Sequence, residues 1–469
     1  MKSTFCGLLC VLTSIAICSG PTARGAEIRA GVAVTDVTPP VGYRMSGYFH
    51  ERPATGTHDP LLAKAIVFGN GDDRAAMVFC DLIGLPRDLS ERIRTAAEKK
   101  TGIPAANVLL AATHTHTGPL YFGALRQQFH DAAVADGSDD PREKVDFPAM
   151  LTEKLVQVIA DAQAASVPVT LHAGIARQQG LSFNRRFHLK DGTVRFNPGV
   201  LNPNIVRTAG PIDPDVGIVL LRRVADDGPM ASLTVFALHL DTVGGTLYSA
   251  DYPYYLQQSL SKKLGSKFVS LFGNGTCGDI NHIDVTQRER LKTQHIGETL
   301  AATVTAELPR LKSVNRPTVT VRREIVVAPL QQFSDEEVAR ARQTMQRISS
   351  GDVPFMDRVT AYKILAVRRR GGETMPLEVQ VFRLGEDLAV VGLPGEVFVD
   401  LGLQIKRASP FAVTLVIELC QDAPGYIPTS KAFAEGSYET VNSRIQSGSG
   451  EKMAEAAVRL LKQLKPAPE

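Results

Sequence analysis

The feature that most constrains the fold is an alternation of short apolar runs with longer helical patterns along nearly the whole chain. Strands are predicted at residues 63–68, 75–82, 107–113, 167–173, 216–221, 233–240, 268–272, 318–327, 378–384, 388–391 and 412–417. Helices are predicted at residues 89–100, 148–164, 252–264, 296–311, 335–348, 360–367, 397–407 and 451–464. Strands that alternate with helices form layers, so we predict an α/β fold with a layered mixed β-sheet flanked by helices.

The composition excludes several classes of protein. With 44% hydrophobic and 22% charged residues, the 469-residue chain resembles neither a collagen, a coiled coil nor a disordered protein. Its 52 basic and 49 acidic residues give a net charge of +3, too balanced for a general nucleic-acid binder. We therefore expect no nucleic-acid partner.

Residues 1–26 have the pattern of a secretory signal peptide. Lys2 precedes an apolar run over residues 5–18, and small residues follow near Ala26. A membrane anchor is the alternative, but about 14 apolar residues fall short of the roughly 20 that span a bilayer. A lipoprotein anchor at Cys18 is disfavoured by the bulky Ile17 before it. We predict a secreted or periplasmic protein with no transmembrane segment in the mature chain.

Removal of this leader leaves 50 basic residues against 49 acidic ones, because it carries Lys2 and Arg24 and no acid. The mature chain keeps Cys80, Cys277 and Cys420. Three cysteines form at most one disulfide, so the fold depends on its hydrophobic core.

The strongest local motif is ATHTHTGP at residues 112–119, at the end of a predicted strand. Residues two apart on a strand share a face, so His114 and His116 are expected to converge on a metal or a substrate. The Thr-Gly-Pro that follows lacks the Asp and His of a metallo-β-lactamase motif. An amidohydrolase barrel would carry this motif on its first strand, whereas several strands precede it here.

His239 ends another predicted strand, and Glu396 follows a Pro-Gly turn before a predicted helix. Zinc favours imidazole and carboxylate ligands, and catalytic zinc sites use three protein ligands and leave a position open. The alternatives are a core histidine at His239 and a charge favoured by a helix N-terminus at Glu396.

Other loops carry further candidate catalytic or ligand-binding residues. Gly273, Gly275 and Gly278 surround Asp279 in a turn that could approach a ligand closely, although it lacks the spacing and Lys of a phosphate loop. Tyr426 and Tyr438 are candidate oxyanion donors or metal ligands, with packing as the alternative. Arg185 and Arg186 are candidate substrate contacts, with surface charge as the alternative. The polar segment 127–147 is predicted to be an exposed loop, or else a lid over the site.

Read in order, these segments resemble the catalytic domain of the neutral (alkaline, non-lysosomal) ceramidase family. The similar segments are AGVAVTDVTPPVG, GTHDPLLAKAIVF, ATHTHTGP, SFNRR, FALH, ADYPYYLQQSL, GNGTCGD, LPGE and GYIPTSKAF followed by SYE. They extend over nearly the whole chain after residue 26. Their number and order make the resemblance specific.

The resemblance implies a single zinc ion held by four residues: His114, His239, Glu396 and Tyr426. It also implies three residues that face the substrate: His116, Arg185 and Tyr438. The implied domain organisation is a signal peptide over residues 1–26 and one zinc hydrolase domain over residues 27–469. The immunoglobulin-like domain that follows in the family is not expected here.

The implied activity is zinc-assisted hydrolysis of an N-acyl amide, such as a ceramide-like lipid. Where the family reads GDVSPN, this chain has Gly-Asp-Ile-Asn-His-Ile, so Asn281 replaces a serine and His282 adds an imidazole. This departure leaves the exact substrate open. The alternatives are a zinc hydrolase acting on an ester or another small amide, and a non-catalytic binding protein that retains the metal pocket.

Overall fold

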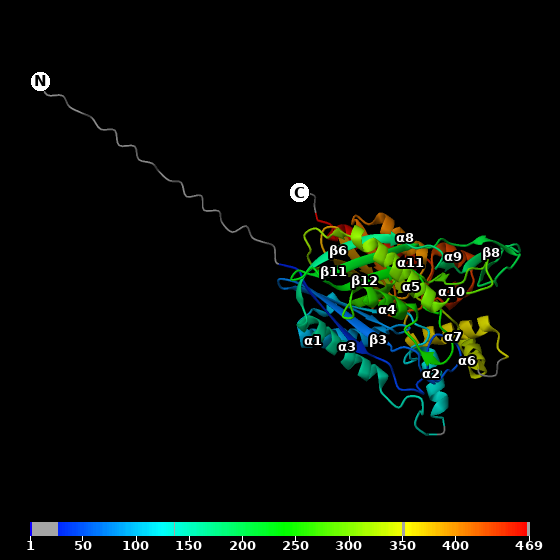
Figure 1. Ribbon diagram of the computed structural model, residues 1–469. Coiled ribbons are helices and arrows are strands. Elements are labelled where there is room, and N and C mark those ends of the chain that lie inside the picture. Colours follow the sequence, from blue (N-terminus) through cyan, green and yellow to red (C-terminus); the bar gives the residue numbers. More distant parts are fainter. Residues whose placement is uncertain (2–26, 136, 349–351, 467–469) are drawn as a thin grey trace.

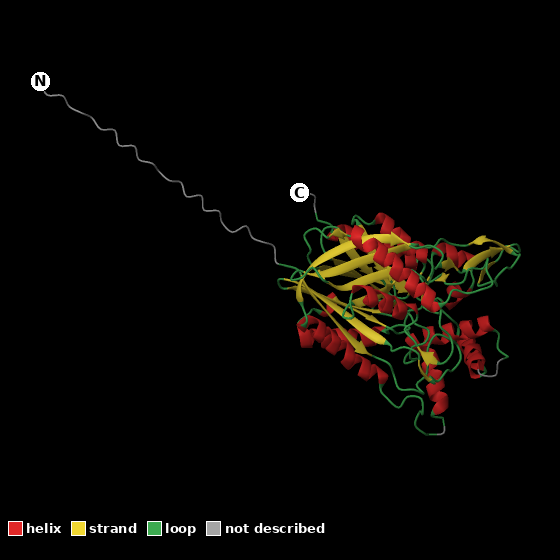
Figure 2. Cartoon of the chain, in the orientation of Figure 1, coloured by secondary structure: helices red, strands yellow, loops and turns green. Residues whose placement is uncertain are grey.

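The computed structural model describes Met1 and residues 27–135, 137–348 and 352–466. Residues 2–26, which make up nearly all of the predicted signal peptide, lie outside these ranges. Two β-sheets lie between helices in the described part of the chain (Figures 1 and 2).

The larger sheet has nine strands in the order β14-β12-β11-β6-β1-β3-β4-β5, with β16 paired to β6. These strands are β1 (Arg29–Asp36), β3 (Leu62–Asn70), β4 (Asp73–Cys80), β5 (Val108–Ala112), β6 (Val167–Arg177), β11 (Asp215–Arg223), β12 (Pro229–Phe236), β14 (Val269–Asn274) and β16 (Lys312–Ser313). Strands β4 and β5 are parallel, as are β12 and β14, while the other neighbours are antiparallel. The sheet is therefore mixed, as predicted.

The second sheet has four strands in the order β17-β18-β19-β21, and its last pair is parallel. These strands are β17 (Thr320–Pro329), β18 (Thr374–Arg383), β19 (Leu388–Gly392) and β21 (Val413–Ile417). It packs face to face against the larger sheet, because Ile66 and Met77 of the larger sheet share one buried apolar cluster with Phe382 and Val390 of the second. This shared core fixes the distance and orientation between the sheets.

Helices cover the outer face of each sheet. The larger sheet is covered by α1 (Arg87–Thr101), α3 (Phe147–Ala164), α4 (Tyr252–Leu264) and α5 (Thr293–Glu307). The second sheet is covered by α8 (Val399–Ala408) and α11 (Ser449–Leu464). Alternate residues of β3 point to opposite layers, since Ala65 faces the helices and Ile66 faces the second sheet. The predicted α/β class with helices flanking layered sheets is confirmed, in a four-layer arrangement.

A separate group of helices packs beside the sheets: α2 (Gly123–Ala133), α6 (Asp335–Gln346) and α7 (Phe355–Arg370) (Figure 1). Helix α2 corrects the prediction of a continuous loop over residues 127–147. Leu125 and Phe129, one turn apart, are buried against α6 and α7. Apolar periodicity did not predict this helix, because only two of its residues form the buried apolar face and a polar, acidic stretch follows it.

The structure also differs from the sequence prediction in other places. Strand β1, which was not predicted, lies in the middle of the larger sheet between β6 and β3, and its small residues hid it. The strand predicted over 233–240 ends at Phe236. The remaining short elements are β2 (Gly56–Thr57), β7 (Phe183–Asn184), β8 (Arg186–Leu189), β9 (Val194–Phe196), β10 (Ile205–Thr208), β13 (Leu247–Tyr248), β15 (Ile280–Asn281), β20 (Glu396–Val397), β22 (Tyr426–Ile427), α9 (Ser430–Glu435) and α10 (Tyr438–Asn442).

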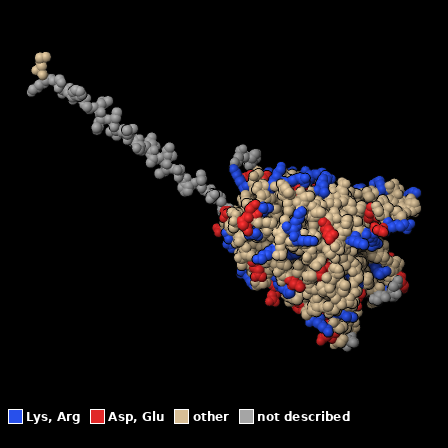
Figure 3. Space-filling model, viewed as in Figure 1, with Lys and Arg blue, Asp and Glu red and all other residues tan. Residues whose placement is uncertain are grey.

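Charges of both signs are interspersed over the face of the molecule in Figure 3, in keeping with the balanced composition. Among the helices of the described residues, none is both long and apolar enough to cross a bilayer.

A buried ion pair joins α1 to the second sheet and provides a test of the packing. Arg94 Nη1 and Nη2 donate to Glu378 Oε2 and Oε1 over 3.1 and 3.0 Å. Glu378→Ala leaves the buried guanidinium without this carboxylate, which we expect to lower the free energy of unfolding by about 3–5 kcal/mol. Denaturant unfolding measures this loss.

The control is Glu324→Ala, because the carboxylate of Glu324 pairs with Arg459 at the surface. That variant should lose less than about 1 kcal/mol. Equal losses in the two variants would contradict the importance of the buried pair.

Candidate metal centre and active site

Three side chains from distant parts of the sequence converge at the carboxyl ends of the parallel strand pairs. His114 follows β5, His239 follows β12 and Glu396 follows β19. His114 Nε2 lies 3.0 Å from His239 Nε2 and 3.4 Å from Glu396 Oε2. His239 Nε2 lies 3.6 Å from the same carboxylate oxygen.

Backbone carbonyls orient both imidazoles. The Nδ1 atom of His114 lies 2.8 Å from the carbonyl oxygen of Ile83, and that of His239 lies 3.2 Å from the carbonyl oxygen of Cys277. A carbonyl oxygen can only accept a hydrogen bond, so each Nδ1 carries the proton. Each Nε2 therefore directs a lone pair toward the place where the two rings and the Glu396 carboxylate converge. Metal-binding histidines are held in the same way, through the ring nitrogen that does not touch the metal.

This donor set fits a zinc ion. Two lone pairs that face each other repel unless a cation or a proton lies between them. Tetrahedral zinc with bonds of about 2.0–2.1 Å separates its ligand atoms by roughly 3.3 Å. The three separations among His114, His239 and Glu396 are 3.0, 3.4 and 3.6 Å, close to this value.

The fourth predicted ligand is brought to the site by a short parallel strand pair. Strands β20 and β22 place Glu396 directly opposite Tyr426. The sequence predicts that Glu396 opens a helix, but α8 begins only at Val399, so strand pairing rather than a helix N-terminus positions this carboxylate.

The charge states of these residues suit metal binding. Burial alone would raise the pKa of Glu396, but His114 and His239 lower it to about 2. Burial holds the pKa of His239 well below its ordinary value. At neutral pH the carboxylate is ionised and this imidazole is neutral, the states in which both groups bind a metal.

The two histidines of the ATHTHTGP motif meet through a turn. The sequence predicts that they share one face of a strand, but β5 ends at Ala112 and His114 has a φ of 80°. This prediction is wrong, although the rings do lie together, with 3.4 Å between the two Nε2 atoms. Burial and the neighbouring His114 lower the pKa of His116 to about 4.

His116 and Tyr438 line a cleft of about 160 Å³ beside the converging ligands, and His114, Glu396 and Tyr426 also reach it. Much of the remaining wall is apolar or aromatic: Tyr48, Phe49, Ile83, Leu120, Phe122, Leu125, Tyr362 and Leu419. No described residue of segment 127–147, which the sequence left open as a lid, lines this cleft.

Arg185 is buried behind the cleft and does not line it. Its guanidinium donates to the Tyr426 hydroxyl over 3.1 Å and to the Gly278 carbonyl oxygen over 2.6 Å. Glu439 accepts from Arg185 and from Arg186, over 2.9 and 3.0 Å. The alternative that the two arginines are surface charges is therefore wrong, since both are buried in an ion network.

The glycine-rich turn approaches protein backbone. A Cβ atom on Gly278 would lie 2.5 Å from the carbonyl oxygen of Glu396, so glycine is required for this close approach. The sequence suggested that the turn contacts a ligand, but no residue from 273 to 279 lines the cleft. The turn instead supports the strand that carries Glu396.

The chain is similar to neutral ceramidase from Pseudomonas aeruginosa, with 24% identity over an alignment 470 positions long that covers 87% of this chain. The crystal structure of that ceramidase matches with a TM-score of 0.68 and 19% identity, over 95% of this chain and 76% of the other. A ceramidase structure described as complexed with C2 matches with a TM-score of 0.67, 18% identity and coverage of 95% and 77%. No protein-family profile matches the chain.

The resemblance to the neutral ceramidase family is confirmed. The chain shares the neutral ceramidase fold and spans 66% of the length of the Pseudomonas ceramidase sequence. The positions that depart from the ceramidase pattern lie outside the cleft. Asn281 donates to Asn197 over 2.9 Å, and His282 Nδ1 lies 3.2 Å from Asp241 Oδ1.

Sequence reasoning missed Glu418, which holds the loops of the site together. Its Oε2 atom accepts the backbone N–H groups of Cys277 and Val397 over 3.1 and 2.7 Å. Burial raises the pKa of this carboxyl group well above its ordinary value. A charged residue directly after the apolar strand β21 was the signal in the sequence.

Two threonines and an arginine fix the histidine turn. The hydroxyl groups of Thr115 and Thr117 donate to the Ser249 carbonyl oxygen over 2.6 and 2.9 Å. Arg52 donates to the His116 carbonyl oxygen over 2.7 Å. The Arg52 contact was not predictable from the sequence, because 64 residues separate the partners.

A second group of possible metal ligands, His130, Asp140 and Glu143, lies near α2. Its carboxylates already pair with arginines, Asp140 with Arg44 and Glu143 with Arg126. The three cysteines among the described residues, Cys80, Cys277 and Cys420, are buried and free of disulfides.

The ligand assignment can be tested by metal content. We expect His114→Ala to weaken zinc binding by more than the roughly 10–100-fold that loss of an outer-shell partner costs, because a direct ligand is removed. His116→Ala should retain zinc. Elemental analysis and competition with a chelator measure both. Loss of zinc in His116→Ala but not in His114→Ala would overturn the assignment.

The role of Glu418 can be tested by an isosteric pair of variants. Glu418→Leu leaves two buried N–H groups without an acceptor, at a cost of about 1–3 kcal/mol each in the free energy of unfolding. Glu418→Gln keeps an oxygen acceptor and should stay within about 1 kcal/mol of the parent protein. Denaturant unfolding checks this, and similar losses in both variants would contradict it.

Proposed function

We propose that this protein is a zinc-dependent hydrolase that cleaves an N-acyl amide, such as a ceramide-like lipid. One zinc ion would be held by His114, His239, Glu396 and Tyr426. The observation that carries the proposal is the convergence of two Nε2 lone pairs and one carboxylate oxygen beside an apolar cleft. Similarity to a bacterial neutral ceramidase supports the choice of an amide bond.

When bound, zinc lowers the pKa of a coordinated water from about 16 toward 7 and polarises a carbonyl group. The chain supplies the setting for this chemistry. Ionised Glu396 gives the ligand set a negative charge before the metal binds. The negative charge of this buried carboxylate favours the binding of a divalent cation.

His116 and Tyr438 are placed to act on the substrate, since both line the cleft beside the ligands. His116 is neutral at pH 7, and its Nδ1 atom has no hydrogen-bond partner among the described residues. It can therefore accept a proton and later deliver it to the leaving amine. The Tyr438 hydroxyl can donate a hydrogen bond to the oxygen of the amide carbonyl as negative charge develops there.

Arg185 acts on the site through Tyr426 in this proposal. Its guanidinium donates to the Tyr426 hydroxyl and is itself held by Glu439. A donor to the phenol oxygen stabilises the phenolate form that would bind a cation. This makes Arg185 a positioning residue for the metal ligand.

The apolar wall suits the acyl part of the substrate. A cleft of about 160 Å³ is smaller than the roughly 300–1,000 Å³ of pockets that enclose drug-sized ligands. It would hold the amide and the first carbons of an acyl chain, while a longer chain would extend outside. We also propose secretion or export to the periplasm, directed by residues 1–26.

A substrate panel tests the proposal. We expect hydrolysis of short-chain N-acyl sphingoid amides by the zinc-loaded protein, complete loss of turnover after chelation, and recovery when zinc is returned. Liberated amine is measured by chromatography. Matched esters and small non-lipid amides serve as comparison substrates.

Each other outcome points elsewhere. Turnover of the esters alone would replace the amidase with an esterase of the same fold. Stoichiometric zinc binding without turnover of any substrate would favour a binding protein. Amide hydrolysis that persists at full rate after removal of zinc would overturn the metal mechanism.

A further inference from the structure

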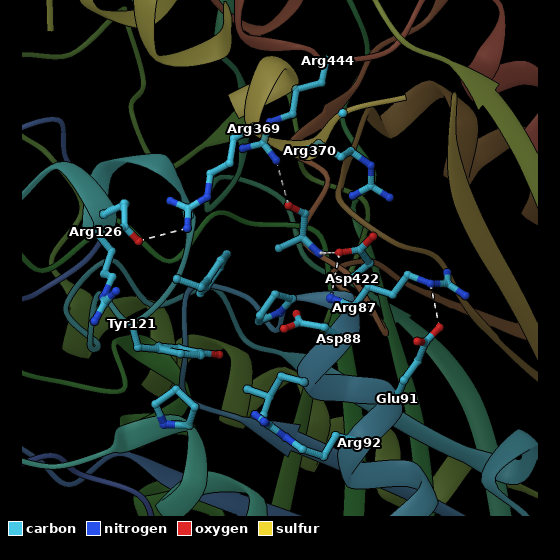
Figure 4. Close-up of a pocket in the computed structure, with 18 of the residues that line it drawn as sticks. Arg87, Asp88, Glu91, Arg92, Tyr121, Arg126, Arg369, Arg370, Asp422 and Arg444 are labelled. Atoms are coloured by element: carbon cyan, nitrogen blue, oxygen red, sulfur yellow. Dashed lines mark hydrogen bonds and ion pairs between the residues drawn. The ribbon is translucent and has the colours of Figure 1, made fainter. Parts of the chain in front are cut away.

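A second, larger cavity of about 740 Å³ adjoins the cleft (Figure 4). It lies between the start of α1, the start of α2 and the end of α7. Six arginines line it: Arg87, Arg92, Arg126, Arg369, Arg370 and Arg444. Only three acidic residues do so: Asp88, Glu91 and Asp422. Positive charge therefore exceeds negative charge in its wall.

Most of these arginines have no carboxylate partner. Arg126 pairs with Glu143, and Arg87 pairs with Glu91. The other four form no ion pair with any residue that the structure describes. Figure 4 shows Arg369, Arg370 and Arg444 along one side of the cavity and Arg87 and Asp88 along the other.

The neutral contacts of these arginines leave donors free. Arg369 donates to the Gln127 side-chain oxygen over 3.0 Å. Arg444 donates to the Ala423 carbonyl oxygen over 3.4 Å and to the Tyr362 hydroxyl over 3.2 Å. The buried Nε of Arg444 and Nη1 of Arg87 have no hydrogen-bond partner within the described parts of the chain.

Asp422 offsets at most one of these positive charges. One of its oxygens accepts the backbone N–H groups of Arg87 and Ala423 over 3.1 and 2.8 Å. Burial raises the pKa of this carboxyl group above its ordinary value, while the charges of Arg370 and Arg87 act in the opposite direction. The excess of guanidinium groups is thus available to a ligand.

The arginine cavity and the catalytic cleft share part of their walls. Phe122, Ala423 and Arg444 line both. The Arg444 guanidinium lies at this boundary. It donates to the hydroxyl group of Tyr362, which lines the cleft, and to the carbonyl oxygen of Ala423, which lines both spaces. The cavity therefore lies directly beside the cleft, with Arg444 at the boundary between them.

We propose that the arginine cavity binds an anionic group of the amide substrate, namely a phosphate, sulfate or carboxylate. Arginine presents paired N–H donors that match the oxygens of these groups. Ceramide itself carries only hydroxyl groups beside its amide and leaves such a cavity unused. The preferred substrate class is accordingly an acidic N-acyl amide. This inference rests on the proposed amidase function of the cleft.

Two short-chain ceramides test the proposal, one with a free primary hydroxyl and one with that hydroxyl phosphorylated. We expect kcat/KM to be about tenfold or more higher for the phosphorylated compound, from charge-assisted hydrogen bonds. The double variant Arg369→Gln/Arg370→Gln should lose this preference through a rise in KM, with kcat retained. Arg368→Gln, on the same helical turn but paired with Asp335, is the matched control and should keep the preference.

A binding measurement separates this proposal from the amidase assignment. Inorganic phosphate should bind the zinc-loaded parent protein in calorimetry, and binding should weaken about tenfold or more in the double variant but not in Arg368→Gln. This readout holds even if no amide is cleaved, because it needs no turnover.

Two results would overturn the proposal. Absence of phosphate binding to the parent protein would mean that the cavity is not an anion site. Phosphate binding with equal kcat/KM for both ceramides would mean that the cavity takes a free anion rather than a group of the substrate. If neither ceramide is cleaved, equal affinity of the protein for the two compounds would likewise mean that the cavity does not bind a group of the substrate.

Discussion

The buried carboxyl group of Glu418 is the interaction on which the site depends. It follows β21 in the second sheet and accepts N–H groups from Cys277 and Val397, so it ties the turn after β14 to the strand that carries Glu396. Face-to-face packing of the two sheets brings these strand ends to one place. Gly278 then permits the backbone contact that no larger residue would allow.

Hydrogen bonds set the chemistry of the site before any ligand binds. Carbonyl acceptors at Ile83 and Cys277 fix the tautomers of His114 and His239, and their lone pairs meet. An isolated arrangement of this kind is unfavourable unless a cation or a proton lies between the two lone pairs. The same logic governs the neighbouring cavity, where an excess of guanidinium groups without carboxylate partners favours an anion. The two places are complementary in charge and share Arg444 as a wall.

Much of the fold could be predicted from the sequence, and much of the site only by resemblance. Apolar periodicity located helices such as α4 at their observed bounds, because amphipathic patterns reflect a single buried face. It missed β1, whose small residues lack that signal, and α2, whose apolar face is narrow. The strand-face argument for His114 and His116 failed because the chain turns after Ala112, and a positive φ cannot be inferred from residue types.

The sequence by itself determined the layered α/β class and singled out His114, His239 and Glu396 as strand-end candidates, since local patterns and residue chemistry suffice for both. Only the tertiary structure decided which atoms meet. Contacts such as Arg185 with Tyr426 join residues 241 positions apart. They depend on sheet packing, strand register and buried hydrogen bonds, which arise from the whole chain at once. The arginine cavity is of the same kind, because its walls come from six separate segments that no local pattern connects.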